Sequence, residues 1–218
     1  MLGYDSTSLT LRRLESAQPS PESARTFGAR LAVTHDAGAA AFGAGPDGCS
    51  GPGFFGPLSH PLPMSVTQHP TWGAFYAAER LQPMVEMAAP RLSFDARKII
   101  DTVMKRCVAG DFDNGDCPAR LHGDLWSGNV MWTPDGVVLI DPAAHGGHRE
   151  TDLAMLALFG CPFFDDILRE YQQVRPLQPG WQTRVGLHQL YPLLAHVVLF
   201  GRGYARQAEA AATMTLGM

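Results

Sequence analysis

Apolar side chains recur every three or four residues in the first half of the chain, which is the spacing of an amphipathic helix. The pattern predicts three helices, over residues 21–35, 72–81 and 99–107. Ser20 and Pro21 suit the start of the first helix, and Pro83 is expected to kink or end the second. Glycine, proline and serine fill residues 36–70, so a long irregular loop is expected between the first two helices.

The period changes in the middle of the chain, where two short apolar runs flank a Thr-Pro-Asp-Gly turn. The runs cover residues 129–132 and 137–141, and a short extended segment precedes them at residues 120–122. Proline presets φ in such a turn and glycine accepts a positive φ, so the sequence predicts a β-hairpin. Further helical patterns cover residues 153–159, 163–174 and 183–204. Together these elements predict an α+β fold that is mostly helical, with an alanine-rich tail at residues 207–218 that frays.

Composition narrows the class of protein without indicating a function. The chain has 218 residues, of which 45% are hydrophobic and 17% charged, so one globular domain is the first expectation. A formal charge of −4 offers no basic surface for nucleic acid. No apolar stretch is long enough for a signal sequence or a bilayer span, which predicts a cytoplasmic protein without a membrane partner. The four cysteines have no C-x-x-C spacing and are expected to be free thiols.

Two aspartates and one asparagine carry the candidate chemistry. His122 and Asp124 form a His-x-Asp motif, Asn129 follows five residues later, and Asp141 ends the second strand of the predicted hairpin. Phosphoryl transfer needs a group that orients the attacking hydroxyl and takes its proton, and hard oxygen ligands for the metal ions. The same spacing marks the catalytic loop and the metal-binding aspartate of protein kinases. We therefore predict Asp124 as the base, and Asn129 and Asp141 as Mg²⁺ ligands.

Longer segments resemble one family of kinase-like proteins. A resemblance to the fructosamine kinase (ketosamine kinase) family, which is related to aminoglycoside and choline kinases, lies in the runs HGDLWSGN, VLIDP and HRETDLAML. Further segments resemble that family in the same order, namely GARLAVTH, WGAFYAAERL and QLYPLLAHVVLFGRGY, so the resemblance covers about residues 27–204. It implies the C-terminal lobe of the protein-kinase-like fold, with a small β-hairpin that carries the metal site.

The resemblance also implies an activity, namely ATP-dependent phosphorylation of a sugar hydroxyl on a ketosamine. The acceptor would be a small molecule or a glycated protein lysine, and Mg²⁺ would accompany ATP. By the matching motif, Trp126 would form a wall for the sugar, while His122 and Asp152 would support the catalytic loop rather than react. The implied division is a hinge-like segment at 1–20, a kinase-like C-lobe at 21–206 with its catalytic loop at 121–129 and metal-site hairpin at 129–141, and the tail at 207–218.

The sequence departs from that family at its start. Kinase-like enzymes hold ATP with an N-terminal lobe, whose glycine-rich loop covers the phosphates and whose strand lysine pairs with them. We expect that lobe to be missing, because residues 1–5 resemble the hinge between lobes and the lysines, Lys98 and Lys105, lie on the helix before the catalytic loop. Three alternatives stay open: a partner chain that covers the face of the missing lobe, an impaired remnant or binding protein, and a kinase for aminoglycosides or choline. The residues that bind the nucleotide stay unknown.

Two other patterns are weaker candidates. Residues 43–48 fit G-x-G-x-x-G, but no predicted strand precedes them and no predicted helix follows, so a surface loop is expected. His145 and His148, with Asp141 and Asp152 nearby, could form a zinc cluster. Their H-x-x-H spacing lacks the helix and the general-base glutamate of metalloprotease sites, so we predict no zinc site there.

Overall fold

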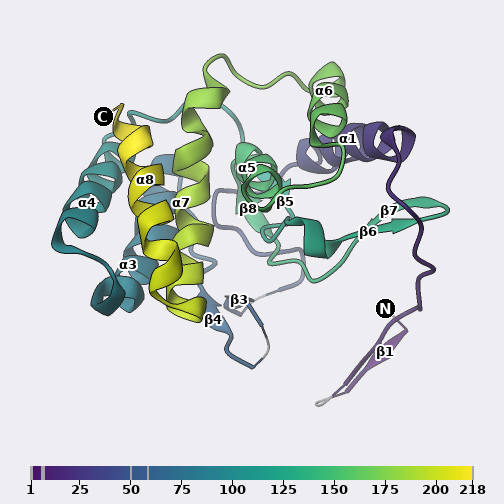
Figure 1. Cartoon of the computed structure of the whole chain (residues 1–218), viewed down its shortest axis with the longest axis horizontal. Helices are drawn as coiled ribbons and strands as arrows, with labels where there is room; N and C mark the ends of the chain where they lie inside the picture. The colour runs from purple at the N-terminus through teal and green to yellow at the C-terminus, as the bar shows by residue number, and fades with distance from the viewer. Residues whose placement is uncertain (1, 6–7, 50, 58, 218) are drawn as a thin grey trace.

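The helices form two groups, one on each side of the central helix α5 (Glu150–Phe159) (Figure 1). This computed structural model describes residues 2–5, 8–49, 51–57 and 59–217; residues 1, 6 and 7 of the hinge-like segment, 50 and 58 of the long loop, and 218 of the tail lie outside these ranges. The smaller group contains α1 (Pro21–Asp36) and α6 (Phe164–Val174). The larger group contains α2 (Trp72–Phe75), α3 (Gln82–Ala88), α4 (Phe94–Val108), α7 (Trp181–Phe200) and α8 (Ala205–Leu216). Each group has its own hydrophobic core, and α5 contributes side chains to both.

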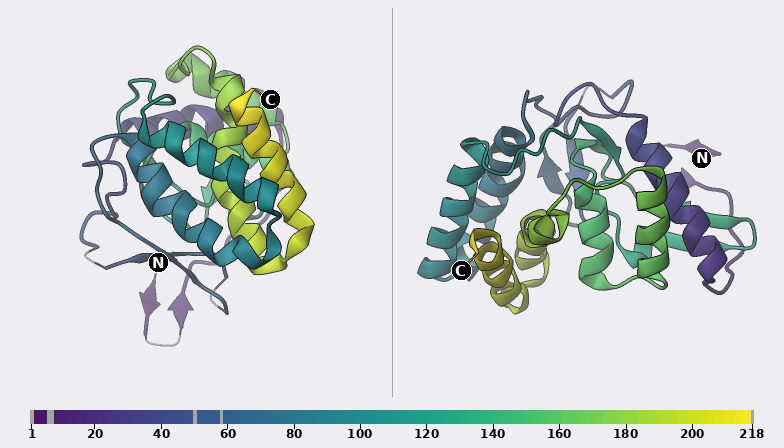
Figure 2. Two further views of the ribbon diagram at one scale, coloured as in Figure 1. Left: turned by 90° about the vertical axis from the view of Figure 1, so that its left-hand side faces the viewer. Right: turned by 90° about the horizontal axis from the view of Figure 1, so that it is seen from above.

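The smaller group depends on a close approach of α1 and α6, which lie side by side (Figure 2). α1 starts where the sequence predicts it, and the Ser20 side chain accepts the backbone N–H of Ser23 at 3.1 Å. Gly28 lies against the backbone of Ile167, and a Cβ atom at this position would be 2.2 Å from the Ile167 carbonyl oxygen. The missing side chain of Gly28 therefore sets the distance between the two helices.

The second predicted helix continues past Pro83. Residues Tyr76–Leu81 form a π-helix between α2 and α3, in which the N–H of Gln82 bonds to the carbonyl of Ala77, five residues back. Pro83 then falls in the first turn of α3, directly after the π-helix. Of the two outcomes expected at Pro83, a kink or an end, the helix does not end there, and its irregularity is a π-helix just before Pro83.

The C-terminal tail is a helix, so the expectation that it frays is wrong. α7 ends at Phe200 rather than at the predicted Tyr204, because Gly201 has a φ of 92° that leaves the helical region. α8 then packs against α7 and α4. Its buried face consists of small residues, namely Ala208, Ala211, Ala212 and Thr215.

The strands are short and pair as four antiparallel two-stranded sheets within the described ranges. The pairs are β1 (Gly3–Tyr4) with β2 (Leu9–Thr10), β3 (Gly53–Phe55) with β4 (Leu62–Met64), β5 (Ala119–Leu121) with β8 (His145–Gly147), and β6 (Val130–Thr133) with β7 (Gly136–Leu139). The β6–β7 hairpin is the predicted one, with Thr133 opposite Gly136 across the Pro-Asp turn. β3 and β4 lie inside residues 36–70, so the prediction of a wholly irregular loop is wrong there.

Four other expectations from the sequence can be compared with the structure. The elements form an α+β fold that is mostly helical. Residues 43–48 form a loop, which the N–H of Gly43 ties to the carbonyl of Gly146 at 2.7 Å. Lys98 and Lys105 lie on α4, and the four cysteines are free. Among the described helices, none combines the length and the apolar character needed to cross a membrane.

Candidate active site

The predicted catalytic loop joins β5 to the β6–β7 hairpin and brings Asp124 and Asn129 into contact. The side-chain nitrogen of Asn129 donates to the carboxylate of Asp124 at 3.1 Å and to its backbone carbonyl at 2.8 Å. Asn129 is buried and Asp124 is half-buried. Because the amide nitrogen faces Asp124, the side-chain oxygen of Asn129 is left for another partner.

Asp152 holds the loop from the side of α5. It is fully buried, and its carboxylate accepts the backbone N–H groups of His122 at 2.8 Å and Gly123 at 2.9 Å. Nε2 of His35 lies 3.0 Å from the same carboxylate. Burial by itself raises the pKa of Asp152, but the hydrogen bonds from His35 and the loop outweigh it and hold the pKa below its usual value. These are the contacts expected of a residue that supports the loop.

His122 ties the loop to the end of β7. Its Nε2 lies 2.9 Å from the carbonyl oxygen of Ile140 and donates to it, while Nδ1 accepts the backbone N–H of Asp124 at 3.3 Å. The backbone N–H of Ile140 donates to the backbone carbonyl of Asn129 at 3.1 Å. Asp141 follows directly, exposed and with a φ of 51°, which aspartate tolerates better than most residues. The hairpin therefore places Asp141 close enough to Asp124 for its negative charge to raise the pKa of Asp124.

The surroundings of Asp124 make its carboxylate a stronger base than that of an exposed aspartate. Burial raises the pKa of Asp124 to about 6, and the nearby carboxylates of Asp152 and Asp141 add to the rise. The His122 ring and the hydrogen bond from Asn129 act in the opposite direction. A general base is most effective when its pKa lies near the working pH, so this shift suits proton transfer close to neutrality.

Trp126 begins a line of aromatic rings that starts two residues from Asp124. We call this line the aromatic strip; it consists of Trp126, Phe159, His196, Phe200 and Tyr204, and its ring centroids lie 4.8–6.3 Å from their neighbours. Trp126 is 40% exposed and Phe200 62% exposed. Burial lowers the pKa of His196, whose Nδ1 donates to the carbonyl of Pro192 at 2.7 Å. A neutral His196 therefore keeps Nε2 as an acceptor.

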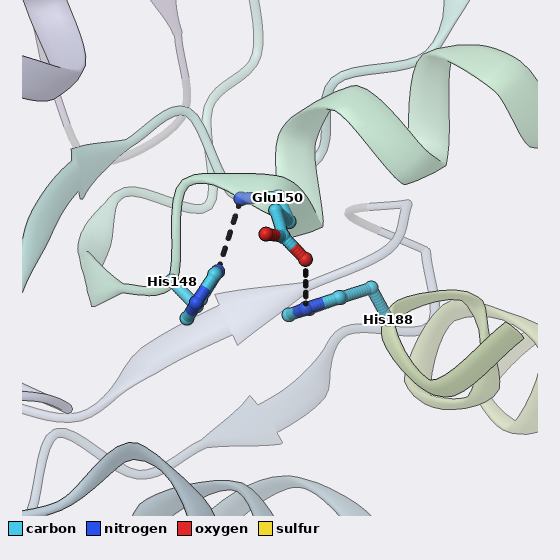
Figure 3. A group of neighbouring side chains, drawn as sticks. All are labelled: His148, Glu150 and His188. Atoms are coloured by element: carbon cyan, nitrogen blue, oxygen red, sulfur yellow. Dashed lines mark hydrogen bonds and ion pairs between the residues drawn. The ribbon is translucent and has the colours of Figure 1, made fainter. Parts of the chain in front are cut away.

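The sequence did not predict a buried polar cluster between the start of α5 and α7 (Figure 3). It consists of His148, Glu150 and His188, whose donor atoms all lie within 4.8 Å of one another. Nε2 of His188 lies 3.3 Å from an oxygen of Glu150, and the Glu150 backbone N–H donates to Nδ1 of His148 at 3.2 Å. Arg184 donates to both carboxylate oxygens of Glu150, at 2.9 and 2.6 Å.

The arrangement of this cluster is that of an ion-pair network. Arg184 uses both oxygens of Glu150 and neutralises their charge, which opposes a divalent cation at the same place. Burial alone raises the pKa of Glu150, but the contact with His188 and the hydrogen bonds from Arg184 hold it well below the usual value. His145 is not part of this cluster, and its Nδ1 donates to the carbonyl oxygen of Ala143 at 2.9 Å.

Two further polar residues near the loop, His35 and Tyr171, are not among the site residues predicted from the sequence. Nδ1 of His35 lies 2.8 Å from the hydroxyl of Tyr171, and both side chains are buried. A signal for His35 exists in the sequence, because it continues the apolar face of α1 that is formed by Ala24, Gly28 and Leu31. A histidine at such a position must find polar partners inside the protein.

Comparisons with known proteins agree on one family. A family model described as fructosamine kinase matches residues 4–217. A probable ketoamine kinase of Enterococcus faecium is 33% identical over 212 residues, which cover 96% of this chain and 73% of that protein. The ketosamine-3-kinase of Mus musculus is 34% identical over 144 residues, which cover 66% of this chain and 46% of that protein.

A solved structure extends the likeness to three dimensions. The crystal structure of a candidate fructosamine-3-kinase from Thermobifida fusca superposes with a TM-score of 0.90 at 44% identity, over 99% of this chain and 72% of that one. The matched segments cover 73% and 65% of the lengths of two of the curated relatives and about half of the lengths of six others.

Proposed function

The chain belongs to the fructosamine kinase family, and we propose that it phosphorylates a sugar hydroxyl of a ketosamine, with ATP as the phosphoryl donor. The kinase-like fold expected from the sequence is confirmed by the Thermobifida fusca structure. The observation that carries the proposed activity is the setting of Asp124. It is half-buried, it bonds to Asn129, and it stands on a loop that Asp152 holds through two backbone N–H groups.

Asp124 acts as the general base. With a pKa of about 6 its carboxylate is ionised at neutral pH, and it is basic enough to draw a proton from a hydroxyl as that hydroxyl attacks. Asn129 bonds to Oδ2, which leaves Oδ1 for the acceptor hydroxyl. His122 keeps the Asp124 backbone in place through Nδ1, so the loop presents the carboxylate in one orientation.

Asn129 and Asp141 fit the ligand preference of Mg²⁺. The side-chain oxygen of Asn129 is free of Asp124, and the carboxylate of Asp141 is exposed, so both offer hard oxygen atoms on neighbouring segments. Bound ATP·Mg²⁺ would supply the phosphoryl group and offset its negative charge. The Ile140 N–H that bonds to the backbone of Asn129 would hold the two ligands in register.

The aromatic strip is the surface that suits the acceptor. The apolar face of a sugar ring can rest on Trp126, which is 40% exposed and follows the base by two residues on the catalytic loop. The amine of a ketosamine is a cation near neutral pH, and cations are stabilised over aromatic faces. Nε2 of His196 would accept a hydrogen bond from that amine. We therefore infer a preference for a sugar that carries a protonated amine, either as a small molecule or on a glycated protein.

The direct test is transfer of phosphate from ATP·Mg²⁺ to fructosyl-lysine by the purified chain and by Asp124→Asn. Because general-base catalysis contributes about 10²–10⁴-fold, Asp124→Asn is expected to lose at least about 100-fold in kcat. The matched control is Asp135→Asn, which changes an exposed aspartate in the β6–β7 turn and should leave kcat unaltered. Undiminished transfer by Asp124→Asn would contradict the assignment of the base.

An acceptor series completes the experiment. Fructosyl-lysine should be phosphorylated in preference to fructose, which has the sugar but not the amine, and to an aminoglycoside or choline. Equal rates with fructose would contradict the proposal that the aromatic strip binds the amine. A preference for an aminoglycoside would favour the alternative of an aminoglycoside kinase.

A further inference from the structure

We propose that His35 and Tyr171 are positioning residues, which set the catalytic loop by fixing the carboxylate of Asp152. The inference rests on the proposed function, because it concerns the loop that carries Asp124. It adds two residues from helices that contribute nothing to the sequence motif, and it is independent of the identity of the acceptor.

The three side chains form a line of hydrogen bonds across three helices. The hydroxyl of Tyr171, on α6, lies 2.8 Å from Nδ1 of His35, in the last turn of α1, and Nε2 of His35 lies 3.0 Å from Oδ2 of Asp152 on α5. The same Oδ2 accepts the N–H of His122, and the other oxygen accepts the N–H of Gly123. His35 is 2% exposed, and Tyr171 and Asp152 are fully buried.

The direction of each hydrogen bond follows from the chemistry of the groups. The carboxylate of Asp152 can only accept, so Nε2 of His35 carries a proton and donates to it. In the neutral ring Nδ1 is then an acceptor, and the Tyr171 hydroxyl donates to it. One tautomer of His35 satisfies the whole line.

Loss of the Tyr171 hydroxyl would disturb Asp152 through His35. Without that donor, the His35 ring can adopt the other tautomer, in which Nε2 presents a lone pair to an anionic carboxylate. The carboxylate of Asp152 would then be free to rotate on the two loop N–H groups. Packing alone does not require this arrangement, because a leucine at position 35 would continue the apolar face of α1.

The test compares two buried tyrosines that each lose only a hydroxyl. Tyr171→Phe is expected to raise the hydrogen-exchange rate of the loop peptide that contains His122 and Gly123 by about tenfold, which corresponds to about 1.4 kcal/mol. It should also lower kcat about tenfold while the KM for fructosyl-lysine changes less than about twofold. The matched control is Tyr76→Phe, whose hydroxyl bonds to the backbone of Leu187 and Tyr191 in the larger core.

Tyr76→Phe should lower the free energy of global unfolding by about as much as Tyr171→Phe does. It should leave the exchange rate of the loop and kcat at their wild-type values. His35→Ala should repeat the effect of Tyr171→Phe, and His35→Gln should restore part of it, because the glutamine amide can donate to Asp152 and its carbonyl can accept from Tyr171. Equal loop exchange in Tyr171→Phe and Tyr76→Phe would overturn the inference. If the wild-type chain transfers no phosphate, the proposed function fails, and the exchange rates still decide whether His35 and Tyr171 position the loop.

Discussion

Replacing Gly28 by alanine should push α1 and α6 apart, although alanine is the better helix former. A Cβ atom at this position would lie 2.2 Å from the Ile167 carbonyl oxygen and 2.9 Å from its carbon, and backbone atoms cannot rotate away. Ordinary contact begins at 3.4 Å, so the helices must separate by about 1 Å. Overpacking costs about 1–3 kcal/mol, and a clash with backbone belongs at the upper end. The higher helix propensity of alanine offsets about 1 kcal/mol of this cost, so the free energy of unfolding should fall by about 2 kcal/mol.

Urea unfolding, followed by circular dichroism, measures this loss as a lower midpoint at an unchanged m-value. Gly203→Ala is the matched control, since nothing lies within 4 Å of the Cβ atom that it would add. That variant should be neutral, or more stable by at most about 1 kcal/mol. A Gly28→Ala protein as stable as the Gly203→Ala protein would refute the argument that this glycine sets the helix spacing.

Two further predictions concern buried polar groups. Asp152→Asn should lower the free energy of unfolding in urea by about 3–5 kcal/mol, because the NH₂ group of asparagine is a donor and would face backbone N–H groups that are also donors. Asp101→Asn, which breaks an exposed pair with Lys105, should be close to neutral, and equal losses would contradict the special role of the buried carboxylate. Acid should also destabilise the protein: burial lowers the pKa of His145 to about 3 and lowers the pKa of His148 as well. Below the unfolded pKa of about 6.5 the unfolded chain binds protons that the folded chain does not, so stability is complete above that pH and is lost as the pH falls. His145→Gln should flatten the slope of unfolding free energy against pH by up to about 1.4 kcal/mol per pH unit, and an unchanged slope would exclude His145 as a source of acid sensitivity.

The parts of the fold that could be predicted from the sequence are those that local signals determine. α1 starts at Pro21 because the Ser20 cap and the fixed φ of proline act within a single turn. The β6–β7 hairpin follows from the Pro-Asp-Gly turn, which sets its register without help from the rest of the chain. The contact between Asp124 and Asn129 is equally local, since the two residues lie five positions apart in one loop.

The parts that could not be predicted depend on partners far along the chain. The alanines of α8 carry no strong amphipathic pattern, and the helix is ordered because α4 and α7 cover its small-residue face. Pro83 looks like the end of a helix unless the π-helix before it is known. The strands β3 and β4 lie in a segment rich in glycine and proline, where turn residues outweigh the weak strand signal.

The candidate site combines both kinds of information, which explains why a motif alone describes it incompletely. Asp124, Asn129 and Asp141 can be read from their spacing because the chemistry requires particular side chains on one loop and one hairpin. The groups that hold this loop come from elsewhere, since His35 and Asp152 are 117 residues apart in the chain. Gly28, a residue without any functional group, lets α1 approach α6, which carries Tyr171, the second partner of His35. The orientation of the base therefore depends on helix packing as well as on the motif, and substitutions between α1 and α6 should act on the loop before they act on the larger core.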